Sequence, residues 1–278
     1  MQEKQVSVFL PDSFLSETSD LRLKTSKIGV IGRVLAVFNV NQVVIYKDLS
    51  VNNESGIEKN SKDGDFMAEI LEFMNTPQYL RKKAFPIKSS LKHVGILPPL
   101  RTPHHPVSTP EVGDFRMGFT VKRNKKGTFI DIGMEDLAFC KEQLSVNKIF
   151  SFKITKLAKE VIVTPDEPDD VYWGYKTLST KKSLKNSLKL VKPNLVIETT
   201  RYADNLNTIF NEFESKIEQS NSIAILFGGP YSSLDDNIES PSWDTLKVNM
   251  VPNQGTETVR TEEAVISTLS VVNLLLNQ

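Results

Sequence analysis

Two short segments near the carboxyl end of the sequence have the composition of a ligand-binding site. Residues 227–230 and 251–258 each contain glycine, and each lies at the end of a short predicted strand. Glycine allows a ligand to approach the backbone closely, and N–H and C=O groups at strand ends can hydrogen-bond an adenine ring and a ribose. Together the segments indicate a nucleoside site. Either segment alone is also typical of a tight turn, and that alternative stays open.

Four side chains outside these two segments are suited to proton transfer or to the stabilisation of charge. His104 and His105 are adjacent in a proline-rich stretch, and Arg260 and Glu262 follow the second glycine segment. His105 or Glu262 can take a proton from a ring nitrogen or a ribose hydroxyl within hydrogen-bonding reach. Arg260 can neutralise a phosphate or a negative charge that develops on a base. The structural alternatives are a surface histidine pair and an ion pair where a helix starts.

Several common types of site are not predicted. The sequence has no glycine-rich dinucleotide fingerprint and no P-loop, which argues against a conventional dinucleotide or nucleoside triphosphate site. Cys140 is the single cysteine, and there are three histidines without the familiar spacing of zinc ligands. We therefore expect neither an internal disulfide nor a bound metal.

The distribution of charge is more informative than its sum. Lysine plus arginine and aspartate plus glutamate both total 34, so the net charge is +0. Residues 175–192 nevertheless carry several lysines and no acidic residue, and a second basic cluster consists of Lys122, Arg123, Lys125 and Lys126. Such clusters can bind phosphates by displacing counterions. They can equally be solvated surface, and both interpretations are kept.

The hydrophobic pattern predicts an α/β protein that is interrupted by an all-β segment. Strands and helices alternate before residue 100, which favours a parallel sheet with crossover helices. Prolines lie on both sides of residues 101–168, where short strands around a turn at 124–127 predict a small barrel. The expected strands are 6–10, 40–46, 115–121, 128–133, 150–157, 160–164, 195–199, 223–227 and 246–250, and the expected helices are 13–37, 66–74, 202–219 and 262–276.

Six blocks of sequence carry a resemblance to a known family. They are VSVFLP at 6–11, TPQYLRK at 76–82, PPLRTPHH at 98–105, YWGY at 172–175, FGGP at 227–230 and NQGTETVRTEEA at 253–264. The last block is the most specific because it is the longest. On these blocks the chain resembles the SPOUT-class RNA methyltransferases of archaea and eukaryotes.

The resemblance implies a fold, a cofactor and a set of contacts. The α/β fold would be a methyltransferase domain of residues 1–100 and 169–278, with a trefoil knot in about 195–278 and an S1/OB-like barrel inserted at 101–168. The implied cofactor is S-adenosylmethionine, bound mainly by backbone groups, and the implied assembly is a homodimer. The implied cofactor contacts are Phe227, Gly228, Gly229, Pro230, Val251, Pro252, Asn253, Gln254, Gly255, Thr258, Val259 and Ala264. The catalytic candidates are Arg260, Glu262 and His105, and the candidates for RNA contact are Arg101, His104, Lys122, Arg123, Lys125 and Lys126.

We therefore expect an S-adenosylmethionine-dependent RNA methyltransferase that acts on a base of ribosomal or other structured RNA. Two alternatives belong to other classes: an RNA-binding module whose knot is inactive, and a dimeric assembly protein. No apolar run is long enough to cross a bilayer, and the amino terminus lacks the pattern of a signal peptide. A cytoplasmic location without a membrane partner is expected.

Overall fold

The structure is a computed structural model, and it describes residues 4–49, 61–230, 234 and 238–277. The chain forms two compact units. The first consists of Met1–Glu72, His93–Pro98 and Tyr175–Gln278, and the second consists of Phe73–Lys92 and Pro99–Gly174. The second unit is therefore an excursion from the first, and the chain returns to the first unit before its carboxyl-terminal third.

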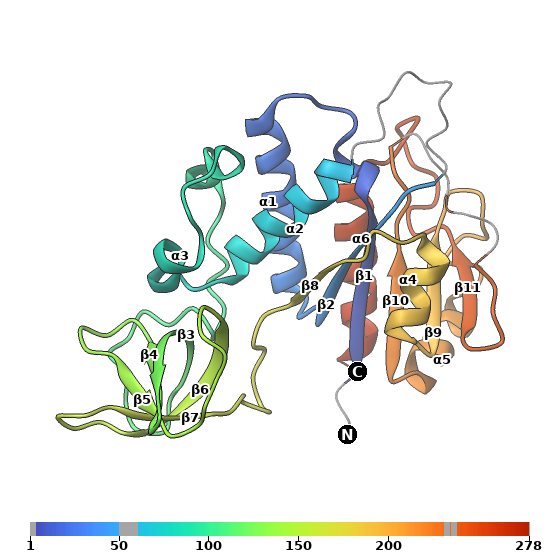
Figure 1. Ribbon diagram of the computed structural model, residues 1–278. Coiled ribbons are helices and arrows are strands. Elements are labelled where there is room, and N and C mark those ends of the chain that lie inside the picture. The colour runs from blue at the N-terminus through green and yellow to red at the C-terminus, as the bar shows by residue number, and fades with distance from the viewer. Residues whose placement is uncertain (1–3, 50–60, 231–233, 235–237, 278) are drawn as a thin grey trace. The chain divides into compact units, whose positions relative to one another are not determined.

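A six-stranded parallel sheet forms the centre of the first unit (Figure 1). Its order is β11-β9-β10-β1-β2-β8, and every neighbouring pair is parallel. The central strands are apolar runs that are buried on both faces, as expected where helices cover a sheet on two sides. The strands are β1 (Gln5–Pro11), β2 (Gln42–Tyr46), β8 (Lys176–Ser179), β9 (Leu195–Thr199), β10 (Ser222–Leu226) and β11 (Asp244–Val248).

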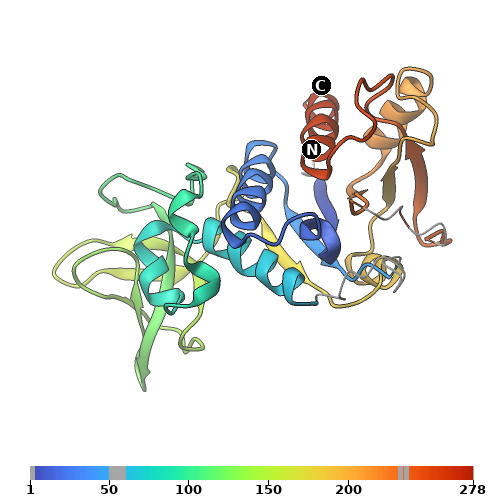
Figure 2. The ribbon, with the colours of Figure 1, turned by 90° about the horizontal axis from the view of Figure 1, so that it is seen from above.

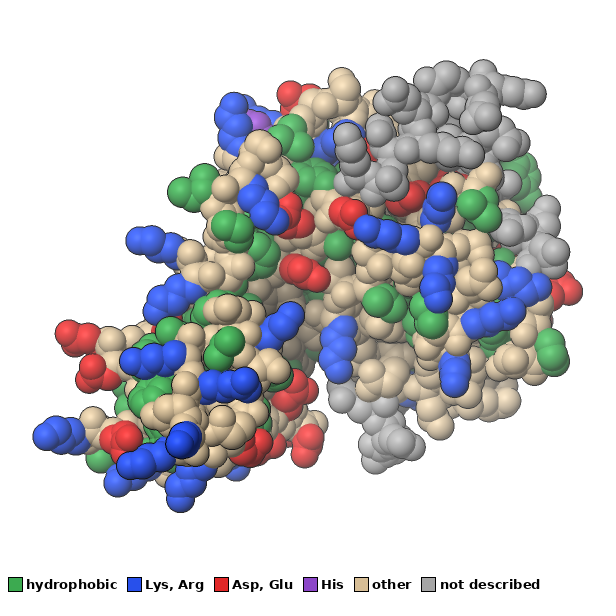
Figure 3. Space-filling model, in the orientation of Figure 1, with side chains coloured by type: hydrophobic (Ala, Val, Ile, Leu, Met, Phe, Trp, Pro, Cys, Tyr) green, Lys and Arg blue, Asp and Glu red, His purple; other side chains and the backbone are tan. Residues whose placement is uncertain are grey.

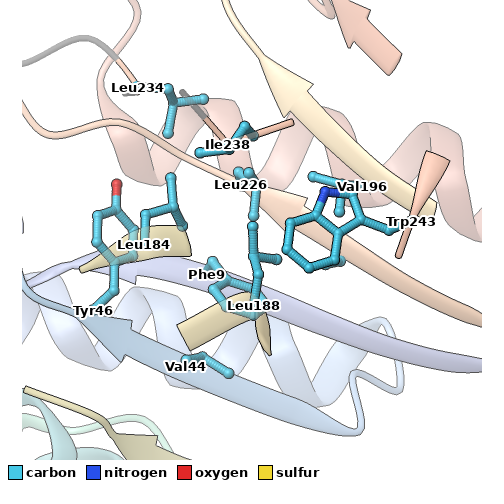
Figure 4. Packing of buried hydrophobic residues seen from close by; sticks show 11 residues of the cluster. Phe9, Val44, Tyr46, Leu184, Leu188, Val196, Leu226, Leu234, Ile238 and Trp243 are labelled. Carbon is cyan, nitrogen blue, oxygen red and sulfur yellow. The ribbon is translucent and has the colours of Figure 1, made fainter. Parts of the chain in front are cut away.

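Helices lie on both faces of this sheet. On one face α6 contacts both α1 and α5, and α4 lies on the opposite face (Figure 2). There Leu184 and Leu188 pack against side chains from β1, β2, β9 and β10 and against Trp243 (Figure 4). The helices are α1 (Leu21–Val37), α2 (Ser61–Asn75), α4 (Leu184–Val191), α5 (Phe210–Gln219) and α6 (Thr261–Leu276), with short 3-10 helices at Asp12–Leu15 and Val94–Ile96.

The first helix starts later than its sequence pattern predicts. The pattern favours one helix over 13–37, whereas α1 begins at Leu21. Asp20 is its N-cap, and the side chain of Asp20 accepts a hydrogen bond from the backbone N–H of Leu23 at 2.8 Å. A carboxylate that satisfies one of the free N–H groups at a helix end fixes the start there. Leu23, in the first turn of α1, is 60% exposed, although its spacing with Ile28, Ile31 and Leu35 suggests an inward position.

The lysine-rich residues 175–192 contribute two elements that the sequence did not predict. They form β8, at the edge of the sheet beside β2, and then α4. Leu184 and Leu188 are four residues apart and both are buried, but α4 spans only two turns, and such a short periodic signal is weak. The helix expected over 202–219 is also shorter, because α5 begins only at Phe210.

A closed barrel, in the order β3-β4-β5-β7-β6, forms most of the second unit, which confirms the predicted small barrel. Its strand β5 was not predicted, since three residues are too few to show alternation. The turn into β4 needs glycine, because a Cβ at Gly127 would lie 2.1 Å from the carbonyl oxygen of Cys140. The strands are β3 (Phe115–Asn124), β4 (Gly127–Asp131), β5 (Ala138–Cys140), β6 (Ile149–Lys156) and β7 (Ile162–Pro165).

Helix α3 (Gln78–Ala84) packs against the barrel, followed by a 3-10 helix at Ser89–Leu91. The hydroxyl of Tyr79 donates to the carbonyl of Met117 in β3 at 2.8 Å, and Lys83 forms an ion pair with the buried Asp131. A Cβ at Gly133 would lie 2.6 Å from the ring of Tyr79, so the helix and the barrel are in close contact. The second unit consequently extends beyond residues 101–168.

Candidate functional site

A cavity of about 460 Å³ lies where β9, β10 and β11 end. The carboxyl edge of a parallel sheet is a common place for ligands, because the loops there leave backbone groups accessible. The volume is within the range of small-molecule sites. The cavity is lined by Glu17, Thr199, Thr200, Arg201, Tyr202, Phe227, Gly228, Gly229, Pro230, Leu234, Asn249, Met250, Val251, Gln254, Thr258, Val259, Arg260, Thr261, Ala264 and Thr268.

The segment after β10 is anchored on three sides. The N–H of Phe227 donates to the carbonyl of Phe9 at 3.1 Å, and its own carbonyl accepts from the buried hydroxyl of Tyr46 at 2.9 Å. The carbonyl of Gly228 accepts from Oγ1 of Thr261, the first residue of α6, at 3.2 Å. Strands β1 and β2 and helix α6 therefore hold this wall of the cavity in place.

The segment between β11 and α6 folds back on itself. Nε2 of Gln254 donates to the carbonyls of Thr256 at 2.9 Å and Glu257 at 3.0 Å. Asn253 has a φ of 55°, in the left-handed region that asparagine tolerates better than most residues. The result is a compact loop that brings Gln254 and Val259 to the cavity.

Most of the residues assigned to the cofactor from the sequence meet at this cavity. Those that line it are Phe227, Gly228, Gly229, Pro230, Val251, Gln254, Thr258, Val259 and Ala264. The other three, Pro252, Asn253 and Gly255, are described by the structure and do not line it. A Cβ at Gly255 would meet no protein atom within 4 Å, so packing does not require glycine there.

Arg260 lines the cavity with its side chain exposed. Its backbone N–H donates to Oε2 of Glu263 at 2.9 Å, which caps the start of α6. Within the described part of the chain, no hydrogen bond or ion pair occupies its guanidinium. Arg260 therefore caps α6 through its backbone N–H, and its side chain is available to a ligand.

Glu262 is placed differently from its sequence assignment. It does not line the cavity, and its Oε2 lies 3.4 Å from Nζ of Lys27 in α1. Lys27 also pairs with Glu17, at 2.9 Å. The structural alternative for Glu262, an ion pair at the start of a helix, is therefore present, with Lys27 as the partner. The acidic residue that lines the cavity is Glu17.

Two charged residues at the cavity were missed. Glu17 comes from the segment before α1, and no local signal in the sequence marks it. Arg201 follows β9, and the strand-end argument used for residues 227–230 would have found it. Nη1 of Arg201 donates to the carbonyl of Glu257 at 2.7 Å, and its guanidinium lies 4.8 Å from the ring centroid of Tyr202. Arg201 is therefore held at the wall of the cavity.

The histidine pair belongs to the second unit. Nε2 of His104 and Nε2 of His105 lie 2.9 Å and 3.0 Å from the same acceptor, the carbonyl oxygen of Asn75. Burial lowers the pKa of His104 to about 3, and burial lowers that of His105 to about 4. Both rings are therefore neutral at pH 7 and donate from Nε2, since a carbonyl can only accept. His104 is completely buried and helps to hold the end of α2.

The remaining residues assigned to RNA lie on the surface of the second unit. Lys122, Arg123, Lys125 and Lys126 are exposed around the turn between β3 and β4. Nζ of Lys122 lies 5.2 Å from the ring centroid of Phe129, an arrangement in which an aromatic face and a cation are presented together. Arg101 is exposed, with a φ of 53°. The barrel thus combines basic and aromatic side chains at one turn.

The described residues contain neither a metal-binding cluster nor a membrane-spanning helix. No group of three or more His, Cys, Asp and Glu side chains among them is arranged to hold a metal ion. No helix among them has the length and apolar character needed to cross a membrane. The one cysteine, Cys140, is buried in the barrel and unpaired.

The chain thus combines an α/β unit that has a cavity at the strand ends with a barrel that carries a basic turn. The family model described as "Putative RNA methyltransferase" matches residues 5–272, which include the sheet, the cavity loops and the barrel. The chain belongs to this family, and it is an RNA methyltransferase. An enzyme of this kind requires a methyl donor.

Three relatives show how far the similarity extends. An uncharacterized protein of Halobacterium salinarum is 27% identical, over 96% of this chain and 98% of its own length. The 28S rRNA (uridine-N(3))-methyltransferases of Drosophila melanogaster and Homo sapiens are 26% and 28% identical over 96% of this chain. The match spans 61% of the fly protein and 77% of the human protein.

Proposed function

We propose that the chain transfers a methyl group from S-adenosylmethionine to a base in ribosomal RNA, with a ring nitrogen of uridine as the first candidate. The cavity at the ends of β9, β10 and β11 is the observation that carries the proposal. The activity for which the fly and human relatives are named supports the choice of ribosomal RNA and of the uridine nitrogen.

The cavity has features that suit S-adenosylmethionine. Oγ1 of Thr268 is buried and has no hydrogen-bond partner within the described residues, although Thr268 lines the cavity. A buried hydroxyl without a partner costs about 1–3 kcal/mol, which a ligand with a suitably placed acceptor would recover. Phe227–Pro230 and Val251 would hold the nucleoside through backbone groups. Pro252, Asn253 and Gly255 stay predictions as contacts.

S-adenosylmethionine, when bound, would supply a methyl group on a sulfonium centre; the ring nitrogen bonds to the methyl carbon while the C–S bond breaks, and the neutral thioether product leaves. The chain then has to orient the base, exclude water and stabilise the charge that appears when the ring nitrogen loses its proton. Arg260 would stabilise that charge; its guanidinium is a rigid donor fork that lines the cavity and has no partner among the described residues. Glu262 and His105 stay untested as proton acceptors.

We also assign the first unit to the SPOUT class and propose that its carboxyl-terminal part is knotted. The path of the chain supports this. β11 lies at the sheet edge, yet α6 begins beside Gly228, at the end of β10, and packs between α1 and α5. The chain after β11 must therefore pass back over β9 and β10. The barrel would be the S1/OB-like insert of such an enzyme, in a cytoplasmic protein.

A homodimer is the assembly that we propose, with the exposed apolar side chains of α1 and α6 as its first candidate surface. Leu23, Val30 and Val37 are exposed and spaced by seven residues, which places them on one stripe of α1. Ile266 and Leu274 are exposed on α6, which contacts α1. Val30→Glu should yield a monomer in sedimentation velocity, and an unchanged sedimentation coefficient would reject this surface.

Calorimetry and nucleoside analysis test the proposed function. S-adenosylmethionine and its demethylated product should bind to the purified chain, and ribosomal RNA treated with the enzyme should contain N3-methyluridine by mass spectrometry. A methyl group on another nucleoside would replace the uridine assignment. RNA binding without any binding of S-adenosylmethionine would instead favour a module with an inactive knot.

A further inference from the structure

Helix α4 has two faces of opposite character. Leu184, Ser187 and Leu188 are buried against the sheet. Lys185 and Lys189 are four residues apart on the other side of the helix, Lys182 lies just before the N-cap, and Lys192 is the C-cap. We call these four residues the α4 lysine row.

The stretch of sequence that carries the α4 lysine row has no acidic residue. Residues 175–194 contain no aspartate or glutamate. Lys181 pairs with Asp65 at 3.0 Å, whereas none of the four row lysines has an ion pair within the described residues. Basic side chains are spread over the region of Figure 3 where Figure 1 draws α4 in front of the sheet. An uncompensated positive row attracts a polyanion.

The backbone at both ends of α4 adds an independent observation. Lys181 has a φ of 52° and Lys192 a φ of 55°, so each is in the left-handed region. For a residue with a Cβ that region costs about 1–2 kcal/mol, and glycine is the usual residue just after a helix. Lysine at position 192 therefore does not serve the helix end. Glycine would suit the backbone better but would lack the charged side chain, which is exposed and has no ion pair within the described residues.

The α4 lysine row also begins at the edge of the sheet that holds the cavity. In the β8-α4-β9 connection the start of α4 follows the carboxyl end of β8, and the carbonyl of Lys182 accepts from the N–H of Lys47, just after β2. Leu184 and Leu188 belong to the same apolar cluster as Leu234, which lines the cavity (Figure 4). The row thus leads away from the site along one face of the same unit.

We propose that the α4 lysine row is an RNA-binding surface of the first unit, which holds the phosphate backbone of the substrate RNA independently of the barrel. This inference rests on the proposed function for the identity of the substrate. A lysine ammonium group binds phosphate as a point charge, and phosphates are the same in every RNA sequence. The surface would therefore contribute affinity and orientation without sequence specificity.

The test measures RNA binding by the full chain at several salt concentrations. Binding of a fluorescent ribosomal RNA fragment should weaken as salt rises, with a slope of about −0.7 for each phosphate contact on a single strand. In the triple variant Lys185→Gln, Lys189→Gln, Lys192→Gln the slope should become shallower by roughly two. The matched control replaces the same three lysines with arginine and should keep the slope.

A single substitution separates binding from folding. Lys192→Gly should leave the melting temperature unchanged or raise it, because glycine suits the left-handed position, and should still weaken RNA binding a few-fold. Equal slopes for the wild type and the glutamine triple variant would overturn the inference. Polyglutamate serves as a model of an acidic protein. If the glutamine triple variant lost binding to polyglutamate but bound RNA as the wild type does, the inference would also be overturned, and the row would be a surface for an acidic protein partner. A wild-type chain that binds no RNA would instead contradict the proposed function.

Discussion

The two units of the molecule present different kinds of surface to a ligand. The cavity of the first unit is built mainly from backbone and small side chains at the ends of parallel strands, with Arg201, Arg260 and Glu17 as its charged members. The barrel of the second unit presents long basic side chains beside aromatic rings, as Lys122 does over Phe129. A backbone-lined cavity suits one small molecule of defined shape, whereas exposed charges suit a long polyanion.

The cavity and the basic turn should differ in how strongly a substitution changes ligand binding. Phe227 and Gly228 are fixed by hydrogen bonds from Tyr46 and Thr261, so a small shift there would change the shape of the cavity. The lysines around the β3–β4 turn are exposed, and phosphate binding by such groups depends on charge more than on exact position. Substitutions should therefore have steep effects in the first unit and graded effects in the second.

The largest effect is expected at Gly229, which lines the cavity. Gly229→Val should place a branched side chain where the methyl donor lies and lower donor affinity at least about a hundredfold, or about 2.7 kcal/mol. Calorimetry with S-adenosylmethionine measures this. Gly95→Val is the control, because Gly95 does not line the cavity and a Cβ there would meet no atom within 4 Å. Equal affinities for wild type and Gly229→Val would remove residues 227–230 from the site.

The basic turn of the barrel should give the next largest effect. Replacing Lys122, Arg123, Lys125 and Lys126 with glutamine should weaken RNA binding about 25-fold at 0.1 M salt if two of them contact phosphates. Donor affinity should not change. Deleting residues 101–168 is a poorer test, because it would remove the partner of α3. RNA affinity that is unchanged at a fixed salt concentration would show that the turn is merely solvated.

Arg260→Ala should reduce methyl transfer by at least about tenfold, or roughly 1.4 kcal/mol in the barrier. The melting temperature and donor affinity should stay near wild type, because the guanidinium has no structural partner within the described residues and the cap uses the backbone N–H. Arg260→Lys should recover only part of the rate, since it lacks the planar fork. A loss of activity that tracks unfolding would return Arg260 to a structural role.

The last prediction concerns folding stability rather than binding or turnover, and it applies to the second unit at acid pH. Unfolded histidines gain protons below about pH 6.5, whereas burial keeps the pKa of His104 at about 3 and that of His105 at about 4. The stabilisation is therefore complete above pH 6.5 and is lost as the pH falls towards 4, by about 1.4 kcal/mol per pH unit for each proton.

Denaturation can be followed through Trp173, which lies in the second unit, in a Trp243→Phe background. The matched variant His104→Gln keeps a donor for the carbonyl of Asn75 and lacks a titrating ring, so its pH dependence should be shallower. Identical pH profiles for the two proteins would show that His104 does not remain neutral when folded.

The sequence alone determined the elements whose signal is local. Runs such as Val6–Leu10 and Ile223–Phe227 predict buried parallel strands because almost every residue is apolar, and the turn at 124–127 predicts the hairpin of the barrel. The glycine segments at 227–230 and 251–258 could be recognised for the same reason. Loop composition after a strand is a property of neighbouring residues, and most of those residues do line the cavity.

The distant residues that line the cavity beside the two glycine segments can be identified only from the tertiary structure. β11 pairs with β9, so Thr199–Tyr202 comes to lie beside the two glycine segments, and Glu17 reaches the same cavity from the other end of the chain. Lys27 of α1 binds Glu262, a partner that no local pattern could indicate. Strand pairing and helix packing depend on the total apolar surface that the whole chain can bury, whereas sequence patterns report only on residues within a turn or two of each other.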